Sequence, residues 1–198
     1  MKYLKFIFFL SLVPLPLLPY TYFVDGKVAY YIPNSSILRK ITSSSWVNEQ
    51  LEVNVNFFKP KLHHISPFCN ITFASHNGQS LGGKEPINVY LLPFSIGLKY
   101  IISLNNRFDF YCGLGPRIFF LWTNTNSQFV ENHLFNASPG GVVTGGLYCR
   151  IYNHLLLNVF FDYSIGRSTI WKNSQQNVTY NNIQLGGLSA GAGLTLKF

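Results

Sequence analysis

Residues 187–198 read Gly187-Leu188-Ser189-Ala190-Gly191-Ala192-Gly193-Leu194-Thr195-Leu196-Lys197-Phe198. Every even-numbered position in this stretch is apolar, whereas every odd-numbered position is glycine, serine, threonine or lysine. Alternation with a period of two is typical of a β-strand whose two faces meet different surroundings. The carboxy-terminal segment is therefore predicted to be a strand with one apolar face and one small or polar face.

The same alternation runs through two longer segments upstream. The even positions between 90 and 102, and again between 108 and 122, are apolar, while Ser95, Lys99 and Arg117 stand among the odd ones. Counting segments in this way predicts eight strands, near 26–33, 46–57, 63–75, 88–102, 107–122, 140–152, 155–167 and 183–198.

The connections between these strands alternate in length. Those after the second, fourth and sixth strands are short, at 58–61, 103–106 and 153–154. Those after the odd-numbered strands are long and polar, at 34–45, 76–87, 123–139 and 168–182. Short turns at one end and long loops at the other are typical of an outer-membrane barrel.

The composition favours lipid rather than water around such a barrel. Charged residues make up 11% of the chain, whereas a soluble globular protein carries roughly 25%. The apolar stripe from Tyr90 to Tyr100 spans roughly 33 Å of strand, or about 25 Å of height at a tilt of about 40°, which matches the apolar band of a transmembrane barrel. A soluble ligand-binding barrel would instead line its cavity with the apolar residues. We predict an all-β fold, an eight-stranded antiparallel up-and-down transmembrane β-barrel with short periplasmic turns and long extracellular loops.

The amino-terminal segment has the features of an export signal. Lys2 and Lys5 precede an apolar run over residues 6–13, and prolines at 14, 16 and 19 interrupt any spanning helix. We expect residues 1–20 to be a signal peptide, residues 21–198 to be the barrel domain, and the bacterial outer membrane to be the destination.

The face opposite the apolar stripe carries charges and is predicted to line the lumen. Seven charged residues are assigned to it: Glu52, Lys99, Asp109, Arg117, Arg150, Asp162 and Lys197. Because Lys99 and Asp109 are equidistant from Leu104, we expect the hairpin to set them opposite each other. Glu52, Arg117 and Asp162 are expected to form a central cluster. The lumen is thus predicted to be narrow and closed by ion pairs, and the alternative is that water solvates each charge separately.

Several segments resemble a known group of barrels. The signal peptide, the eight strands and the terminal Phe198 resemble the small eight-stranded outer-membrane barrels of Gram-negative bacteria, the OmpA, OmpX and OmpW-like group. Residues 28–41, 96–100, 106–115 and 161–164 are similar to barrel proteins of chlamydia-related bacteria. The resemblance implies that the outer-membrane assembly machinery reads the last strand, with Phe198 as the terminal signal. It also implies a narrow barrel, associated in OmpW-like proteins with passage of small hydrophobic molecules.

No motif in the sequence indicates catalysis, a metal or a cofactor. The G-x-S-x-G match at 187–191 lacks a following acid or histidine, so it is interpreted as plain strand. The five histidines are scattered, and the three cysteines, Cys69, Cys112 and Cys149, match no zinc spacing and are interpreted as small hydrophobic residues. We therefore expect no enzymatic activity.

Two functions remain open from the sequence. The first is a narrow pore or binding barrel for small solutes. The second is a structural or surface protein whose loops mediate adhesion or host interaction. Expected partners are outer-membrane lipid and lipopolysaccharide, whose phosphates Arg39, Lys40, Arg167 and Lys172 would suit, together with the assembly machinery and small solutes or host surface factors. Nucleic acid is not expected, because the net charge of +8 is scattered along the chain.

Overall fold

A computed structural model describes residues 21–42, 45–56, 63–79, 85–125, 133–168, 171–173, 178–180 and 183–198. Eight long strands form the barrel: β1 (Thr21–Pro33), β2 (Trp46–Asn56), β3 (His63–Gln79), β4 (Pro86–Ser103), β5 (Phe108–Thr125), β6 (His133–Tyr152), β7 (Leu155–Ser168) and β11 (Gly187–Lys197). The short elements are the helix α2 (Ser36–Ile41), the paired strands β8 (Trp171–Asn173) and β9 (Val178–Tyr180), and β10 (Ile183–Gln184).

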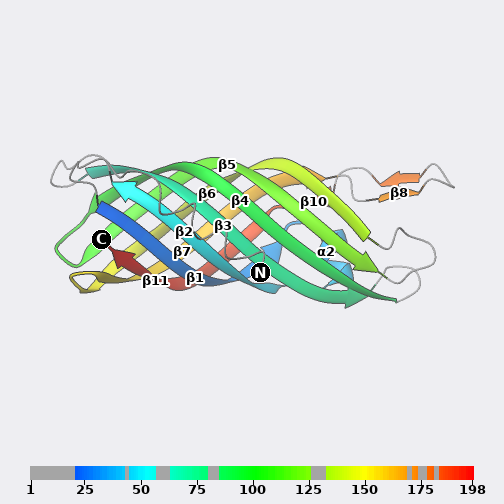
Figure 1. Cartoon of the computed structure of the whole chain (residues 1–198), viewed down its shortest axis with the longest axis horizontal. Helices are drawn as coiled ribbons and strands as arrows, with labels where there is room; N and C mark the ends of the chain where they lie inside the picture. Colours follow the sequence, from blue (N-terminus) through cyan, green and yellow to red (C-terminus); the bar gives the residue numbers. More distant parts are fainter. Residues whose placement is uncertain are drawn as a thin grey trace, which may run out of the picture.

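The strands close into one antiparallel barrel (Figure 1). Each strand from β1 to β7 pairs with the next, and β11 pairs with both β7 and β1. Backbone hydrogen bonds between Tyr22 and Phe198, at 2.9 and 3.1 Å, extend the β1–β11 pairing to the last residue. The predicted fold class is confirmed. The expected signal peptide, the turn at 58–61 and Lys172 lie outside the described residues or side chains.

The side chains alternate between the outside and the interior as the sequence predicts. On β4, Leu98 is 57% exposed and Lys99 is 1% exposed, and on β11, Leu194 is 54% exposed and Thr195 is 0% exposed. A row of exposed apolar side chains therefore covers the outer wall, and polar side chains lie inside. Within the described part of the chain, no helix is long and apolar enough to cross a membrane.

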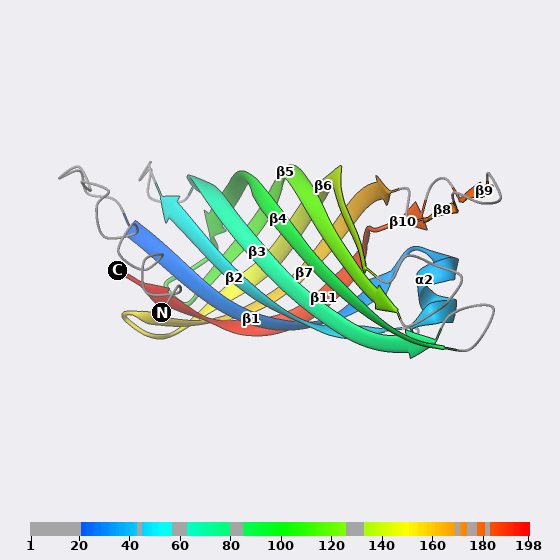
Figure 2. The ribbon, with the colours of Figure 1, turned by 45° about the vertical axis from the view of Figure 1, so that its right-hand side comes forward.

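Two strands extend well into segments that were predicted to be loops. Residues 76–79 of β3 continue to pair with β4, and residues 133–139 of β6 continue to pair with β5. The backbone hydrogen bonds of a ladder do not depend on side-chain polarity, so these polar residues stay in strands rather than in loops. The wall formed by β3, β4, β5 and β6 consequently projects at one end of the barrel (Figure 2), which we call the loop end.

The loop between β1 and β2 contains a helix that the sequence analysis missed. Ser35 is the N-cap of α2, and its Oγ accepts a hydrogen bond from the Leu38 N–H at 3.3 Å. Serine in this position satisfies one of the free amides of the first turn. The helix has only six residues, too few for a helical period to stand out among alternating strands.

At the opposite end, which we call the turn end, the β4–β5 turn corrects one prediction. Asn105 Oδ1 accepts hydrogen bonds from the backbone N–H groups of Arg107 and Phe108, at 2.8 and 2.9 Å. This side-chain cap is typical of Asn in turns. It centres the hairpin on residue 106, so that Lys99 pairs with Gly113 and Asp109 pairs with Ser103. The expected pairing of Lys99 with Asp109 is therefore wrong.

Candidate functional site: the barrel interior

Charged side chains fill the middle of the interior. Asp25 and Lys27 come from β1, Glu52 from β2 and Lys99 from β4, and all four are buried, with exposed fractions of 0–3%. The β1–β2 register places Asp25 directly beside Glu52. Charges removed from water in this way are tolerated only where partners compensate them.

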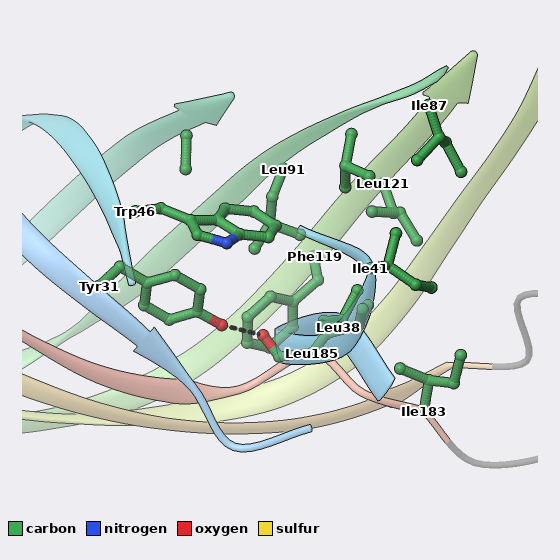
Figure 3. Close-up of a cluster of buried hydrophobic side chains, with 12 residues drawn as sticks. Tyr31, Leu38, Ile41, Trp46, Ile87, Leu91, Phe119, Leu121, Ile183 and Leu185 are labelled. Carbon is green, nitrogen blue, oxygen red and sulfur yellow. Dashed lines mark hydrogen bonds between the residues drawn. The ribbon is translucent and has the colours of Figure 1, made fainter. Parts of the chain in front are cut away.

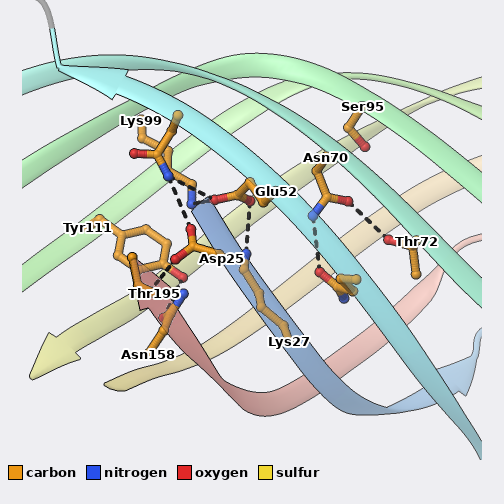
Figure 4. A network of polar contacts seen from close by, with 12 residues as sticks. Asp25, Lys27, Glu52, Asn70, Thr72, Ser95, Lys99, Tyr111, Asn158 and Thr195 are labelled. Carbon is orange, nitrogen blue, oxygen red and sulfur yellow. Dashed lines mark hydrogen bonds and ion pairs between the residues drawn. The ribbon is translucent and has the colours of Figure 1, made fainter. Parts of the chain in front are cut away.

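Two lysines compensate Glu52 from opposite sides (Figure 4). The Lys27 ammonium lies 2.9 Å from Glu52 Oε2, and the Lys99 ammonium pairs with Oε1 of the same carboxylate. Aromatic rings complete the surroundings, with Lys99 Nζ 4.2 Å from the centroid of Tyr111 and Lys27 Nζ 4.8 Å from that of Phe160. A ring face attracts a cation, so these contacts add to the ion pairs.

Asp25 is held by neutral donors. Asn54 Nδ2 and the Tyr148 hydroxyl donate to Oδ2 at 3.1 and 3.2 Å, and the Thr195 hydroxyl donates to Oδ1. These donors come from β2, β6 and β11, so the network joins three sides of the wall. A carboxylate that accepts several hydrogen bonds keeps its charge at lower cost than an unpartnered one.

A second polar group lies around Asp162 of β7. The register places Thr144 and Ser189 on either side of Asp162, and Asn48 Nδ2 donates to Ser189 Oγ at 3.1 Å. Asp162 Oδ1, Thr144 Oγ1 and Asn48 Oδ1 are buried without a hydrogen-bond partner among the described residues. Three unpaired acceptors in one buried region create an incompletely satisfied polar compartment.

Arg117 contributes to the interior in a different way from that predicted. It is 5% exposed, and its Nε donates to Ser95 Oγ at 2.6 Å. The ion pairs within 4 Å among the described residues are those of Glu52 with Lys27 and Lys99, so Glu52, Arg117 and Asp162 do not form the expected ion-paired cluster. The reason is that Lys27 and Lys99 occupy both oxygens of Glu52.

The other predicted lumen residues lie near the turn end. Asp109, Arg150 and Lys197 are half-buried and point to the inner side of the wall. Lys197 Nζ lies 5.8 Å from the centroid of the Phe23 ring. They line the entrance to the interior rather than its centre.

A cluster of buried apolar side chains, which we call the plug, lies at the loop end of the barrel (Figure 3). Leu38 and Ile41 of α2 are buried against inward-facing side chains of the projecting wall. The members of this plug are Tyr31, Leu38, Ile41, Trp46, Ala74, Ile87, Val89, Leu91, Phe119, Leu121, Ile183 and Leu185, with Ile37 packed against it. Its position follows from the projecting wall, whose apolar inner face would otherwise meet water.

Hydrogen bonds hold the plug in place. The Tyr31 hydroxyl donates to the Leu185 carbonyl at 2.6 Å, and Trp46 Nε1 donates to the Thr42 hydroxyl at 2.9 Å. The His76 ring stacks on Trp46, with its Nε2 atom 3.1 Å from the Thr42 carbonyl oxygen. The end of α2 is thereby joined to β2 and β3.

The sequence analysis missed Asp25 and Lys27 because it began the first strand at residue 26 and did not extend the assignment of faces to it. The signal was present, since Val28, Tyr30 and Ile32 form an apolar stripe with Lys27 on the other face. Once Asp25 and Lys27 are included, six charged side chains of the described residues are deeply buried. Three are acids, Asp25, Glu52 and Asp162, and three are bases, Lys27, Lys99 and Arg117. The centre of the interior is electrically balanced.

The chemistry of this interior is that of a sealed polar core. In the part of the chain that the structure describes, no group of three or more His, Cys, Asp or Glu side chains is placed to hold a metal ion. The carboxylates and lysines of the middle cluster are engaged with one another or with neutral donors. The arrangement can tie strands together, block a water path and retain a small polar molecule near Asp162.

Comparison with known proteins identifies the fold. No family model and no curated protein sequence matches the chain. Among solved structures, a major outer membrane protein of Thermus thermophilus aligns with a TM-score of 0.58 and 12% identity, covering 91% of this chain and 100% of that chain. The attachment invasion locus protein Ail of Yersinia pestis gives 0.54 and 11%, covering 90% and 98%. Outer membrane protein W of E. coli gives 0.53 and 14%, covering 89% and 97%. The chain has the fold of the small eight-stranded outer-membrane β-barrels.

Proposed function

We propose that the chain is an integral outer-membrane barrel with a closed interior, acting as a structural or surface protein through its loop end. The observation that carries the proposal is that side chains occupy the lumen at two levels, as the apolar plug and as the Glu52 ion-pair cluster. Of the two functions left open by the sequence, a closed barrel favours the surface protein over the pore.

The two closures block different routes. The plug places apolar side chains inside the lumen at the loop end. Apolar constrictions exclude water and ions by dewetting. Below it, the ion pairs and the aromatic side chains Tyr111 and Tyr148 occupy the middle of a barrel whose strand number leaves room only for side chains or one small ligand.

A surface role is also consistent with a protein of the same fold. Ail is named for attachment and invasion, and it has been solved in complex with the heparin analogue sucrose octasulfate, in a structure that aligns with a TM-score of 0.55 and 12% identity. The loop end of the present chain carries the exposed cations Arg39, Lys40 and Arg167, which would suit an anionic partner.

Binding of a small polar solute is the second candidate. It is favoured by the buried, unpaired acceptor atoms of Asp162, Thr144 and Asn48, which a ligand with several hydrogen-bond donors would satisfy. This function requires the plug to open, whereas the surface role does not. The predicted lack of enzymatic activity, the signal peptide and the recognition of Phe198 by assembly machinery stay predictions.

Conductance of the refolded protein in planar bilayers tests the proposal. We expect no steady conductance from the native chain. A variant with Leu38→Ser and Ile41→Ser loosens only the plug, and we expect it to stay closed because the ion-pair cluster remains. Adding Lys99→Ala and Glu52→Ala should open a path. Steady unit conductance in the native protein would refute the closed interior.

A further inference from the structure

One acidic side chain of the described strands points outward from the barrel wall. Glu49 of β2 is exposed, whereas its chain neighbours Asn48 and Gln50 are buried inside. Along the same outer face of β2, Val47 is 55% exposed and Leu51 is 52% exposed. The register places Val28 of β1 and Phe73 of β3 on either side of Glu49. The carboxylate is therefore surrounded by apolar side chains.

Glu49 lies near the loop-end limit of the apolar band. On β1, exposed or half-exposed side chains run outward from Tyr22 to Tyr30, a length of roughly 26 Å, or about 20 Å of height at a tilt of about 40°. Glu49 is in register with Val28, two residues from Tyr30, so it lies close to the level of that ring in the tilted barrel. An ionisable side chain among apolar ones on the lipid side of the wall marks a site of interaction.

No side chain of the described part of the chain pairs with Glu49. The ion pairs there belong to Glu52, and the hydrogen bonds of the β2 side chains involve other residues, such as Asn48 and Asn54. Among the described strand residues, the remaining acids, Asp25, Glu52, Asp109 and Asp162, lie on the inner side. A partner of Glu49 would have to come from outside the described residues and bring a hydrogen-bond donor to the lipid side of the wall.

The segment that joins β1 to β2 supplies cations at the loop end, where β2 begins. Arg39 and Lys40 in the last turn of α2 are exposed. Leu38 and Ile41, on either side of them, are buried in the plug and anchor the helix. From the loop end downward, the β1–α2–β2 unit presents two cations, the Tyr30 ring, the Glu49 carboxylate and then apolar side chains.

We propose that this face binds an anionic glycolipid of the outer leaflet whose acyl chains carry hydroxyl or amide donors close to the phosphorylated sugars, the chemistry of lipopolysaccharide. The cations Arg39 and Lys40 bind phosphate, Glu49 accepts a hydrogen bond from a donor at the base of an acyl chain, and Val28, Leu51 and Phe73 contact the hydrocarbon. The inference rests on the proposed function, because it requires the loop end to face the outer leaflet.

The position of Glu49 selects this class of lipid over an ordinary anionic phospholipid. A phospholipid such as phosphatidylglycerol brings a phosphate to the cations, but its ester-linked chains carry no donor at the depth of Glu49. It would leave the carboxylate unpaired in hydrocarbon, which is unfavourable. Both lipids are thus expected to bind Arg39 and Lys40 through phosphate, whereas only binding of the glycolipid is expected to depend on Glu49.

The test measures lipid retained by the refolded full chain in phosphatidylcholine nanodiscs, by native mass spectrometry, with either rough lipopolysaccharide or phosphatidylglycerol added. We expect the double variant Arg39→Gln and Lys40→Gln to lower retention of both lipids by about tenfold. We expect Glu49→Leu to lower retention of lipopolysaccharide by about fivefold and to leave phosphatidylglycerol unchanged, and Glu49→Gln, which keeps an acceptor, to have a smaller effect.

Arg107→Gln is the matched control, since it removes one exposed cation from the β4–β5 turn, at the opposite end of the barrel from α2 and Glu49. It should leave both affinities unchanged. The inference is overturned if Glu49→Leu retains lipopolysaccharide as well as the native chain does, or better, or if it changes both lipids equally. A barrel that inserts and stays non-conducting but shows no such dependence would refute the lipid site and leave the proposed function standing.

Discussion

The substitution Glu52→Gln tests whether ion pairs close and stabilise the interior. Glutamine has nearly the same shape, so the packing around residue 52 is retained while the negative charge is removed. Lys27 and Lys99, whose side chains are both 0% exposed, would then keep their charges without the carboxylate that each contacts. Asp25 is the remaining buried carboxylate of the cluster, and its oxygens are already engaged by Asn54, Tyr148 and Thr195.

The expected cost follows from the geometry. At 2.9 Å, the attraction between Lys27 and Glu52 is about 6 kcal/mol for an effective dielectric constant of about 20. Desolvation offsets much of this attraction, but removing one partner leaves the other charge buried, at a cost of about 3–5 kcal/mol. With a urea dependence of about 2 kcal/mol per molar, the unfolding midpoint should fall by roughly 1.5–2.5 M.

The assay is urea unfolding of the refolded chain in lipid vesicles, followed by tryptophan fluorescence and by the shift in gel mobility between unheated and heated samples. Asp109→Asn is the matched control, because it makes the same acid-to-amide substitution at a half-buried position of the turn end that forms no ion pair with the described residues. It should change the free energy of unfolding by less than about 0.5 kcal/mol. Combining Glu52→Gln with Lys99→Met should recover part of the loss. Equal, small shifts for Glu52→Gln and Asp109→Asn would refute the reasoning, because Glu52 would then be as well solvated as a half-exposed carboxylate.

Three further predictions follow from the barrel. Deleting Phe198 removes the backbone pairing with Tyr22 at the β1–β11 seam, and we expect less folded protein in the outer-membrane fraction with normal export; unchanged assembly would contradict the role of the terminal residue. Epitope tags between β5 and β6, at 126–132, should be accessible on intact cells and tags at 104–106 should not, and the reverse pattern would invert the topology. Arg117→Ala should lower the free energy of unfolding by about 1–3 kcal/mol, measured by the same urea titration, because it leaves the buried Ser95 hydroxyl without its hydrogen-bond donor; an unchanged midpoint would indicate that water already solvates Arg117.

The sequence by itself determined the fold class, the number of long strands and the face on which each strand side chain lies. These properties are local. The alternation of apolar and polar residues along a strand depends on what surrounds its two faces and not on which strand pairs with it. The last strand is an example, since Leu194 and Thr195 were assigned to opposite faces from their parity alone and lie there in the barrel. Lys27 was within reach of the same rule and was missed only because the rule was not extended to the first strand.

Only the tertiary structure decided which interior residues meet. Lys99 and Glu52 are 47 residues apart, and their contact depends on the stagger of every strand pair between them, which turn geometry sets. A single Asn105 cap moved the β4–β5 register and separated Lys99 from Asp109. The sequence did not predict the plug either, because α2 is short and its burial depends on how far the facing wall of β3–β6 projects. Alternation along one strand carries no information about stagger between strands, so contacts across the lumen emerge only when the barrel closes.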